Sequence, residues 1–183
     1  LIALGLVNLK LGMYTHFWII ALISLTNVTL NWKKLLNYNK PVQVSSTLGG
    51  YQPNFAVDED MKTYWSAKSG NKGEWFQTDL GEVSTINAIQ INYADQDVEF
   101  MGKPDKTNGH QYILYASKDG KNRKIVVDKS KSTKDVPHEY IELQTPIKTR
   151  FLKLENHGMP TGKFALSGFR VFGKGSGEKP KAV

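Results

Sequence analysis

From residue 37 to residue 173, hydrophobic residues recur at every second position in short runs. In one run, Ile89, Ile91 and Tyr93 alternate with the polar residues Gln90 and Asn92. Side chains alternate between the two faces of a β-strand, so this period indicates strands with one buried face. The runs with the same pattern are 86–93, 111–117 and 150–156.

Further strand-like runs lie between turn signals. The pair Asp119-Gly120 separates two such runs and is a typical hairpin turn. The remaining candidate strands are 41–47, 74–80, 124–128, 138–143 and 164–172. No long helical stripe occurs from 37 to 173, and the pattern therefore predicts an all-β fold, an antiparallel jelly-roll sandwich of about eight strands.

Two connections, Tyr51–Glu74 and Ala94–His110, are too long for simple turns. Long loops on a rigid sandwich commonly carry binding residues. We therefore expect the functional site on these loops.

The ends of the chain differ from its centre. Residues 1–36 are apolar and hold three Lys and no acid, and three interpretations remain open: a remnant of an upstream region, a signal peptide or anchor, or packed structure. Residues 174–183, rich in Gly, Lys and Pro, resemble a linker, so we expect one domain at 37–173.

The net charge of +7 is carried mainly by these ends. Residues 1–36 contribute +3 and residues 174–183 contribute 3 − 1 = +2, whereas residues 37–173 hold 18 basic and 16 acidic residues. A central charge of only +2 does not indicate nucleic-acid binding. The chain has no cysteine, which excludes disulfides and thiolate zinc sites.

The stretch AVDEDMKTYW, residues 56–65, has the composition of an oxygen-rich cation loop. Asp58, Asp60 and Thr63 lie within six residues, and Ca²⁺ prefers carboxylate, hydroxyl and carbonyl oxygens. The loop lacks the Gly and Glu spacing of an EF-hand. The alternative is a hydrogen-bonded turn in which Asp58 and Thr63 satisfy backbone N–H groups.

The order of several motifs resembles the coagulation factor 5/8 type C (discoidin) domain family, and within it the bacterial family 32 carbohydrate-binding modules. The motifs, in order, are Asn39-Lys40-Pro41-Val42; Ala56-x-Asp58-x-Asp60-x-x-Thr63-x-Trp65-Ser66; the W-x-x-x-D-L-G run from Trp75 to Gly81; Tyr115-x-Ser117-x-Asp119-Gly120; Phe151-Leu152-Lys153-Leu154; and Phe169-x-Val171-Phe172-Gly173.

This resemblance implies a galactose-binding-like sandwich, a ligand surface on loops at one end, and a structural calcium held by Ala56, Asp58, Asp60 and Thr63. Bacterial members are accessory modules of glycoside hydrolases, and this copy is similar to modules that follow family 43 catalytic domains. An extracellular, periplasmic or cell-surface location follows from the same resemblance.

The chain departs from the family pattern at three places. Glu59-Asp60 stands where Gly-Asn is usual, Arg123 replaces a Trp, and Gly168 occupies the position of a Glu that reaches the calcium. Loss of a carboxylate predicts weaker calcium binding.

Catalysis is not expected within 37–173. The adjacent carboxylates Asp58, Glu59 and Asp60 cannot stand on opposite sides of a glycosidic bond, as glycoside hydrolysis requires. The four histidines lack zinc-protease spacing, and no Gly-x-Ser-x-Gly motif occurs.

Sugar binding requires an aromatic face and planar polar groups around it. The loop residues of these types are Tyr51, Gln52, Tyr93, Asp95, Gln96, His110, Asn156 and His157. For Tyr93 the alternative is a core position, and for both histidines it is an ordinary solvated loop position.

The sequence favours a non-catalytic carbohydrate-binding module that targets a covalently attached glycoside hydrolase to a polysaccharide. The first alternative is a phospholipid- or protein-binding discoidin domain, with Phe100-Met101-Gly102-Lys103 as an apolar and basic tip. The second is a structural spacer without a ligand. No membrane contact is expected except through residues 1–36.

Overall fold

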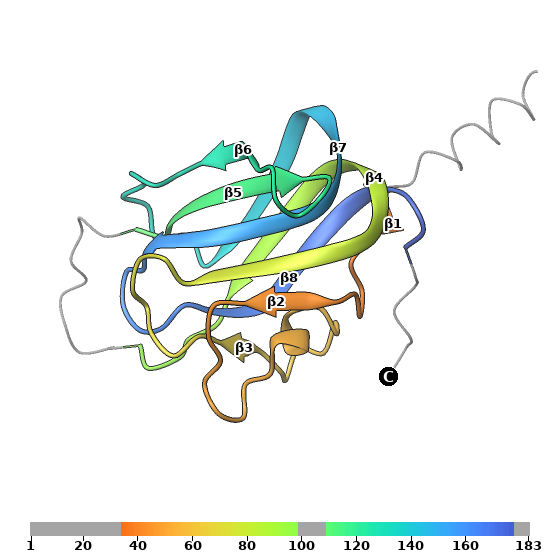
Figure 1. The fold of residues 1–183 in the computed structure, drawn as a ribbon. Helices are drawn as coiled ribbons and strands as arrows, with labels where there is room; N and C mark the ends of the chain where they lie inside the picture. The colour runs from red at the N-terminus through yellow and green to blue at the C-terminus, as the bar shows by residue number, and fades with distance from the viewer. Residues whose placement is uncertain (1–33, 99–108, 178–183) are drawn as a thin grey trace, which may run out of the picture. The chain divides into compact units, whose positions relative to one another are not determined.

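The computed structural model describes residues 34–98 and 109–177. They form an antiparallel β-sandwich of eight strands (Figure 1). The strands are β1 (Lys34–Leu35), β2 (Val42–Val44), β3 (Trp65–Ser66), β4 (Trp75–Tyr93), β5 (Gln111–Ser117), β6 (Lys124–Asp128), β7 (His138–Gly158) and β8 (Ala165–Lys174), with one 3-10 helix, η1 (Pro53–Ala56). The predicted fold class is confirmed.

The hydrogen-bonded strand order is β1-β8-β4-β7-β5-β6, with β2 paired to β4 and β3 paired to β8. All of these pairs are antiparallel. Strand β1 places Lys34 opposite Gly173, so the sheet includes residues on the N-terminal side of the expected boundary at Asn37. No helix within the described ranges is long and apolar enough to cross a membrane.

Two pairs of expected strands are in fact single long strands. The runs 74–80 and 86–93 both belong to β4, and the runs 138–143 and 150–156 both belong to β7. Pairing between β4 and β7 resumes between these runs, with Ser84 opposite Thr149 and Thr85 opposite Lys148. Strands β4 and β7 are therefore continuous, and the sequence prediction of separate shorter strands was wrong for these two.

The W-x-x-x-D-L-G motif builds an irregularity in β4. The Asp79 carboxylate accepts hydrogen bonds from the Gly81 N–H at 2.8 Å and from Arg150 Nε and Nη2 at 2.7 and 2.8 Å. Gly81 has a φ of 85°, a conformation that favours glycine. The register with β7 shifts between Asp79 and Ser84, where the motif ends.

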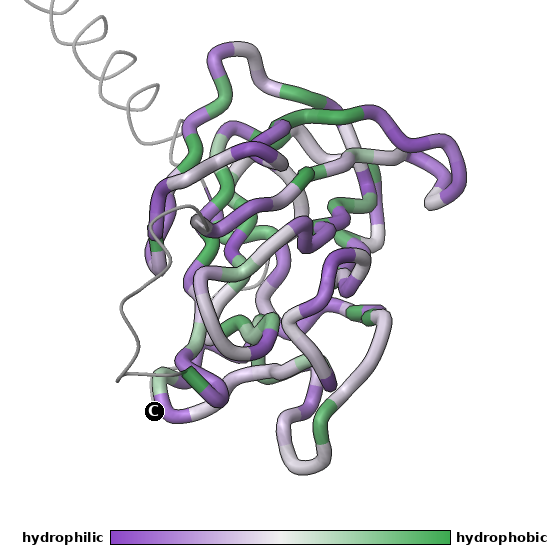
Figure 2. Tube along the Cα trace, turned by 90° about the vertical axis from the view of Figure 1, so that its left-hand side faces the viewer, coloured by the Kyte–Doolittle hydropathy of each residue, from purple (hydrophilic) through white to green (hydrophobic). Residues whose placement is uncertain are grey.

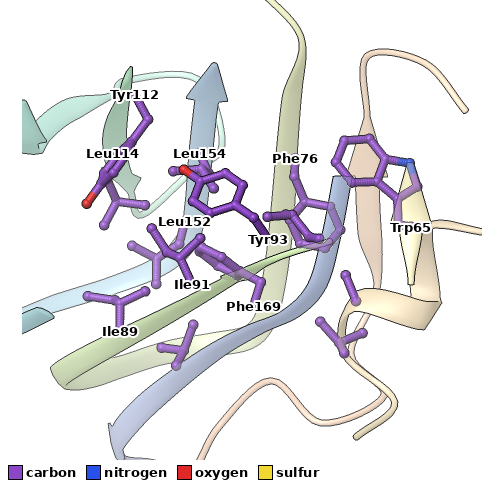
Figure 3. Packing of buried hydrophobic residues seen from close by; sticks show 14 of the residues in the cluster. Trp65, Phe76, Ile89, Ile91, Tyr93, Tyr112, Leu114, Leu152, Leu154 and Phe169 are labelled. Atoms are coloured by element: carbon purple, nitrogen blue, oxygen red, sulfur yellow. The ribbon is translucent and has the colours of Figure 1, made fainter. Parts of the chain in front are cut away.

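The predicted alternation accounts for the core. Ile89, Ile91, Leu152 and Leu154 are fully buried between the layers, and Figure 3 shows them packed together with Phe169. Hydrophobic and hydrophilic residues are interleaved along the strands (Figure 2). Hydrophobic burial therefore specifies which face of each strand points inward.

An aromatic cluster continues the core beneath the loops. Trp65 is completely buried, and its ring lies 5.3 Å from that of Phe76 and 5.4 Å from that of Phe164. Phe76 in turn lies 5.5 Å from Phe169. Trp65 is thus a core residue, whereas Trp75 is only half-buried and lies under the Lys153 ammonium, which is 5.1 Å from its ring centroid.

Candidate functional site

Loops 67–74, 94–98 and 159–164 come together at one end of the sandwich (Figure 1). The Phe164 N–H donates to the Ser69 carbonyl at 3.1 Å, and the Lys163 N–H donates to the Gln96 carbonyl at 2.9 Å. The segment around Leu48 is attached to the same region, since the Leu48 N–H donates to the carbonyl of Ser66, the residue before loop 67–74, at 2.8 Å. Backbone hydrogen bonds therefore hold segments from four parts of the sequence at one end.

Asn156, expected to contact a sugar, braces one of these loops instead. Its side chain is almost fully buried, with 1% exposed, and Nδ2 donates to the Gly70 and Asn71 carbonyls at 2.8 and 2.9 Å. Its Oδ1 accepts from the Gly158 N–H at 3.2 Å. Asn156 therefore holds loop 67–74 in position from beneath the surface.

Tyr93 and His110 are also buried, each with 7% exposed. Their ring centroids are 4.1 Å apart, and His110 Nδ1 accepts a hydrogen bond from the Val136 N–H at 3.1 Å. Burial lowers the pKa of His110, against the opposing effect of the Asp135 and Asp95 carboxylates. The two rings therefore pack together beneath the surface. For Tyr93 this is the core position that the sequence left open as the alternative.

A set of aromatic and polar side chains connects the loops nearer the surface. The rings of Tyr51 and Tyr64 lie 4.7 Å apart with a tilt of 34°. The Tyr64 hydroxyl donates to Gln96 Oε1 at 2.9 Å, Gln96 Nε2 donates to Asp97 Oδ1 at 2.7 Å, and the Lys163 ammonium pairs with Asp97 Oδ2. We call Tyr51, Tyr64, Gln96, Asp97 and Lys163 the loop-end cluster.

The protonation states in the loop-end cluster follow from its contacts. Burial, followed by its contact with Tyr51 and the charge of Asp97, raises the pKa of Tyr64 to about 12, so its hydroxyl remains a donor. Hydrogen bonds from Lys163 and then Gln96 lower the pKa of Asp97. The cluster therefore presents a neutral phenol, a carboxylate and an ammonium next to an aromatic pair.

Sequence reasoning identified Tyr51 and Gln96 but missed Tyr64, Asp97 and Lys163. A signal for Tyr64 was present, because Trp65 points into the core and its neighbour in the chain must point the other way. Asp97 adopts a left-handed φ of 53°, a conformation that asparagine and aspartate tolerate in turns. Its contact with Lys163, 66 residues away, has no local sequence signal.

The other expected sugar ligands are Gln52, Asp95 and His157, and none of them belongs to the loop-end cluster as defined above. Gln52 and Asp95 are exposed loop residues. His157 is 13% exposed, and its Nε2 lies 3.3 Å from Glu155 Oε1. Since side chains alternate along β7, His157 and Glu155 share the face opposite to that of Asn156.

The expected calcium residues form a self-contained loop. Ala56 is buried, and Asp58 accepts from the Asp60 N–H at 2.9 Å through Oδ1 and from the Thr63 hydroxyl at 2.8 Å through Oδ2. Asp60 Oδ1 accepts from the Lys62 N–H at 2.9 Å. In the described part of the chain, no group of three or more His, Asp or Glu side chains is placed to hold a metal.

The Phe100–Lys103 tip and residues 1–33 lie outside the described residues. The lipid-binding alternative and the interpretations of the N-terminal segment therefore stay predictions.

The chain belongs to the F5/8 type C domain family, whose model matches residues 41–167. This confirms the family resemblance that the motifs predicted. No curated protein sequence matches the chain.

Several solved structures with the same fold are carbohydrate-binding modules. A selenomethionine-labelled mutant of chitosan-binding module 1, from a chitosanase/glucanase of Paenibacillus sp. IK-5, is 20% identical with a TM-score of 0.63, covering 77% of this chain and 99% of that chain. Module 2 of that enzyme, in complex with chitotriose, is 20% identical with a TM-score of 0.59 over 75% and 99% of the two chains.

A family 32 module of Clostridium perfringens, in complex with glcNAc-alpha-1,4-galactose, is 14% identical with a TM-score of 0.60, covering 76% of this chain and 94% of that chain. At such identities the likeness establishes the fold. These neighbours are themselves binding modules, and the family model that matches the chain is not that of a catalytic domain.

Proposed function

We propose that this protein is a non-catalytic carbohydrate-binding module and that the loop-end cluster contacts the glycan. The observation that carries the proposal is the Tyr51–Tyr64 ring pair, 4.7 Å apart, beside the hydrogen-bonded Gln96, Asp97 and Lys163. The fold neighbours that bind chitotriose and glcNAc-alpha-1,4-galactose support the same class of ligand.

The chemistry of the loop-end cluster suits a sugar. An aromatic ring buries the apolar C–H face of a pyranose, while polar groups at its edge orient the hydroxyls. Asp97 accepts hydrogen bonds from sugar hydroxyls and Lys163 donates to them, and such charge-assisted bonds are stronger than neutral ones. Both side chains reach solvent, with 55% of Asp97 and 24% of Lys163 exposed.

The supporting residues beneath the surface keep this arrangement fixed. Asn156 holds loop 67–74 through two carbonyls, and Gln96 is itself 9% exposed and hydrogen-bonded at both ends of its amide. Groups that are held in place lose less conformational entropy when a ligand binds. A small site of this kind binds with a Kd of roughly 1 μM to 1 mM, or about −8 to −4 kcal/mol.

Weak binding by one site is useful when the module is tethered. We propose that the natural protein carries a glycoside hydrolase domain and acts outside the cytoplasm, where tethering raises the local concentration of the enzyme on polysaccharide. The neighbours from a chitosanase/glucanase support this arrangement. The family 43 enzymes remain the catalytic partner that the sequence resemblance suggests.

A glycan array followed by isothermal titration calorimetry tests the proposal. The full chain is screened on the array, and chitotriose and glcNAc-alpha-1,4-galactose are then titrated. We expect Tyr51→Ala and Asp97→Asn to weaken binding of the positive ligand at least about tenfold, which corresponds to roughly 1.4 kcal/mol.

Tyr140→Ala is the matched control. Tyr140 is 56% exposed and packs against Phe172, at a ring distance of 6.2 Å, away from the loop-end cluster. Its removal is expected to leave binding unchanged. The proposal is wrong if the folded chain binds no glycan, or if Tyr140→Ala and Tyr51→Ala have equal effects.

A further inference from the structure

The guanidinium of Arg170 lies directly over Gly168 in β8. A Cβ atom built on Gly168 would be 2.7 Å from Arg170 Nη1 and 3.2 Å from Cζ. The guanidinium therefore occupies the space into which a side chain at residue 168 would project. Gly168 is the departure from the family pattern at which other members carry a Glu that reaches the calcium.

Arg170 uses this position to join two segments of the fold. Its Nε lies 2.8 and 2.9 Å from the two carboxylate oxygens of Glu59. Its Nη1 faces the side-chain oxygen of Asn92 once the Asn92 amide is oriented to satisfy its neighbours, and Asn92 pairs with Gly168 across the strands. The cation thus connects loop 56–63 to β8 and β4.

The ion pair is largely shielded from water, since only 18% of the Arg170 side chain and 22% of the Glu59 side chain are exposed. Removal of one member of such a pair leaves a poorly solvated charge without its partner. Glu59 also has a left-handed φ of 61°, which is uncommon for a residue with a side chain. Its contact with Arg170 through both carboxylate oxygens offsets the cost of this conformation.

The oxygens of loop 56–63 do not fit a calcium shell. Calcium requires six to eight oxygen ligands at about 2.3–2.6 Å. Both carboxylate oxygens of Asp58 accept hydrogen bonds from within the loop, those of Glu59 face Arg170, and residue 168 supplies no side-chain oxygen. A guanidinium next to the loop also repels a divalent cation.

We propose that Arg170 is the structural cation of loop 56–63, so that the loop is ordered and the module stable without calcium. Glu59 and Gly168 both depart from the family pattern, and under this proposal both departures serve the placement of Arg170. Gly168 provides the space for the guanidinium, and Glu59 provides its counter-charge. The proposal concerns folding and does not depend on whether the loop-end cluster binds glycans.

Thermal unfolding of the full chain with excess EDTA or with about 5 mM CaCl₂ tests calcium independence. We expect the two Tm values to agree within about 1 °C, because a ligand raises Tm only when it binds the native state. A calcium-dependent increase of about 4 °C or more, corresponding to at least roughly 1 kcal/mol for a domain of this size, would overturn the proposal.

Variants then test the role of Arg170. We expect Arg170→Met and Glu59→Gln each to lower Tm by several degrees, and the double variant to lose less than the sum, because partners in one ion pair are coupled. Arg150→Met is the matched control, since Arg150 also pairs with a carboxylate, that of Asp79, elsewhere in the sandwich.

Amide hydrogen exchange gives a local readout that a general loss of stability does not reproduce. Exchange of the Asp60, Lys62 and Thr63 amides, which are hydrogen-bonded within the loop, should accelerate at least about tenfold in Arg170→Met and remain unchanged in Arg150→Met. Equal exchange in wild type and Arg170→Met, or protection by calcium in wild type, would refute the proposal.

Discussion

Asn156 Nδ2 lies 2.8 Å from the Gly70 carbonyl oxygen, across 86 residues of sequence. The same nitrogen donates to the Asn71 carbonyl, so one buried amide fixes loop 67–74 to the end of β7.

Asn156→Asp is expected to destabilise the protein by about 2 kcal/mol, because a carboxylate oxygen replaces the donor that serves two buried carbonyls. Chemical denaturation at neutral pH measures the effect. Asn54→Asp, at an exposed position of η1, is the control and should change stability by less than about 0.5 kcal/mol. A similar loss in both variants would show that the amide does not hold the loop.

Glu74 accepts hydrogen bonds from three serine hydroxyls, those of Ser45, Ser46 and Ser69. Burial acts to raise its pKa, but the hydrogen bonds outweigh burial and the pKa is lowered. The folded state therefore favours the carboxylate. The resulting stability is present above the usual Glu pKa of about 4.3 and is lost as pH falls through the lower folded-state pKa.

We expect Glu74→Gln to cost about 2 kcal/mol at pH 7 and progressively less below about pH 4, when the wild-type carboxyl is itself protonated. Urea unfolding from pH 7 to pH 3 measures the difference between the two proteins. Asp95→Asn, at an exposed loop position, provides a comparison outside this network. A difference for Glu74→Gln that does not change with pH would contradict the assignment.

The buried His110 is expected to produce a second dependence of stability on pH. As for Glu74, stability should rise with pH, but over a higher pH range. Burial lowers its pKa, so the unfolded chain binds a proton near pH 6.5 while the folded chain resists it. Stability should therefore rise with pH between about 5 and 7. His110→Asn, which keeps an acceptor for the Val136 N–H, should flatten this dependence, whereas His138→Asn at an exposed position should not.

Trp65→Ala is expected to cost about 3–5 kcal/mol, since it removes a fully buried ring from contact with Phe76 and Phe164. Trp75→Ala, at the half-buried position beneath Lys153, should cost clearly less. Denaturant titration of the two variants gives the comparison. Equal costs would mean that burial does not distinguish the two tryptophans.

Tyr64→Phe separates the two contributions of Tyr64 to the proposed site. The ring remains beside Tyr51, but the hydrogen bond to Gln96 is lost. One such bond is worth about 1 kcal/mol, so we expect glycan affinity to fall roughly fivefold, less than for Tyr51→Ala. Calorimetric titration with the ligand found on the array measures both. If Tyr64→Phe binds the glycan as tightly as wild type, the hydrogen bond from Tyr64 does not position Gln96 for binding.

Local sequence information predicted the core better than the site. Alternation in β4 and β7 identified Ile89, Ile91, Leu152 and Leu154 as buried, because the period of two is a property of the strand itself. The same reasoning divided β4 and β7 into shorter strands, because turn residues such as Gly81 do not reveal that pairing resumes beyond them.

The site depended on contacts that no local pattern encodes. Of the residues with binding chemistry, Tyr93, His110 and Asn156 are buried by neighbours distant in sequence, and Tyr64 is joined to Asp97 only through Gln96. Composition identified polar and aromatic loop residues, but the side chains that reach the surface depend on how four segments meet.

Motif order and hydrophobic periodicity are local properties of the chain, and they were enough to predict the family, the antiparallel sandwich and the inward face of its strands. The division of the loop residues into buried supports and solvent-facing groups, and the contact of Arg170 with Glu59 beside Gly168, became visible only in the folded molecule. These contacts join residues that are far apart along the chain. Glu59 and Arg170 are 111 residues apart, and only the completed sandwich brings their opposite charges together.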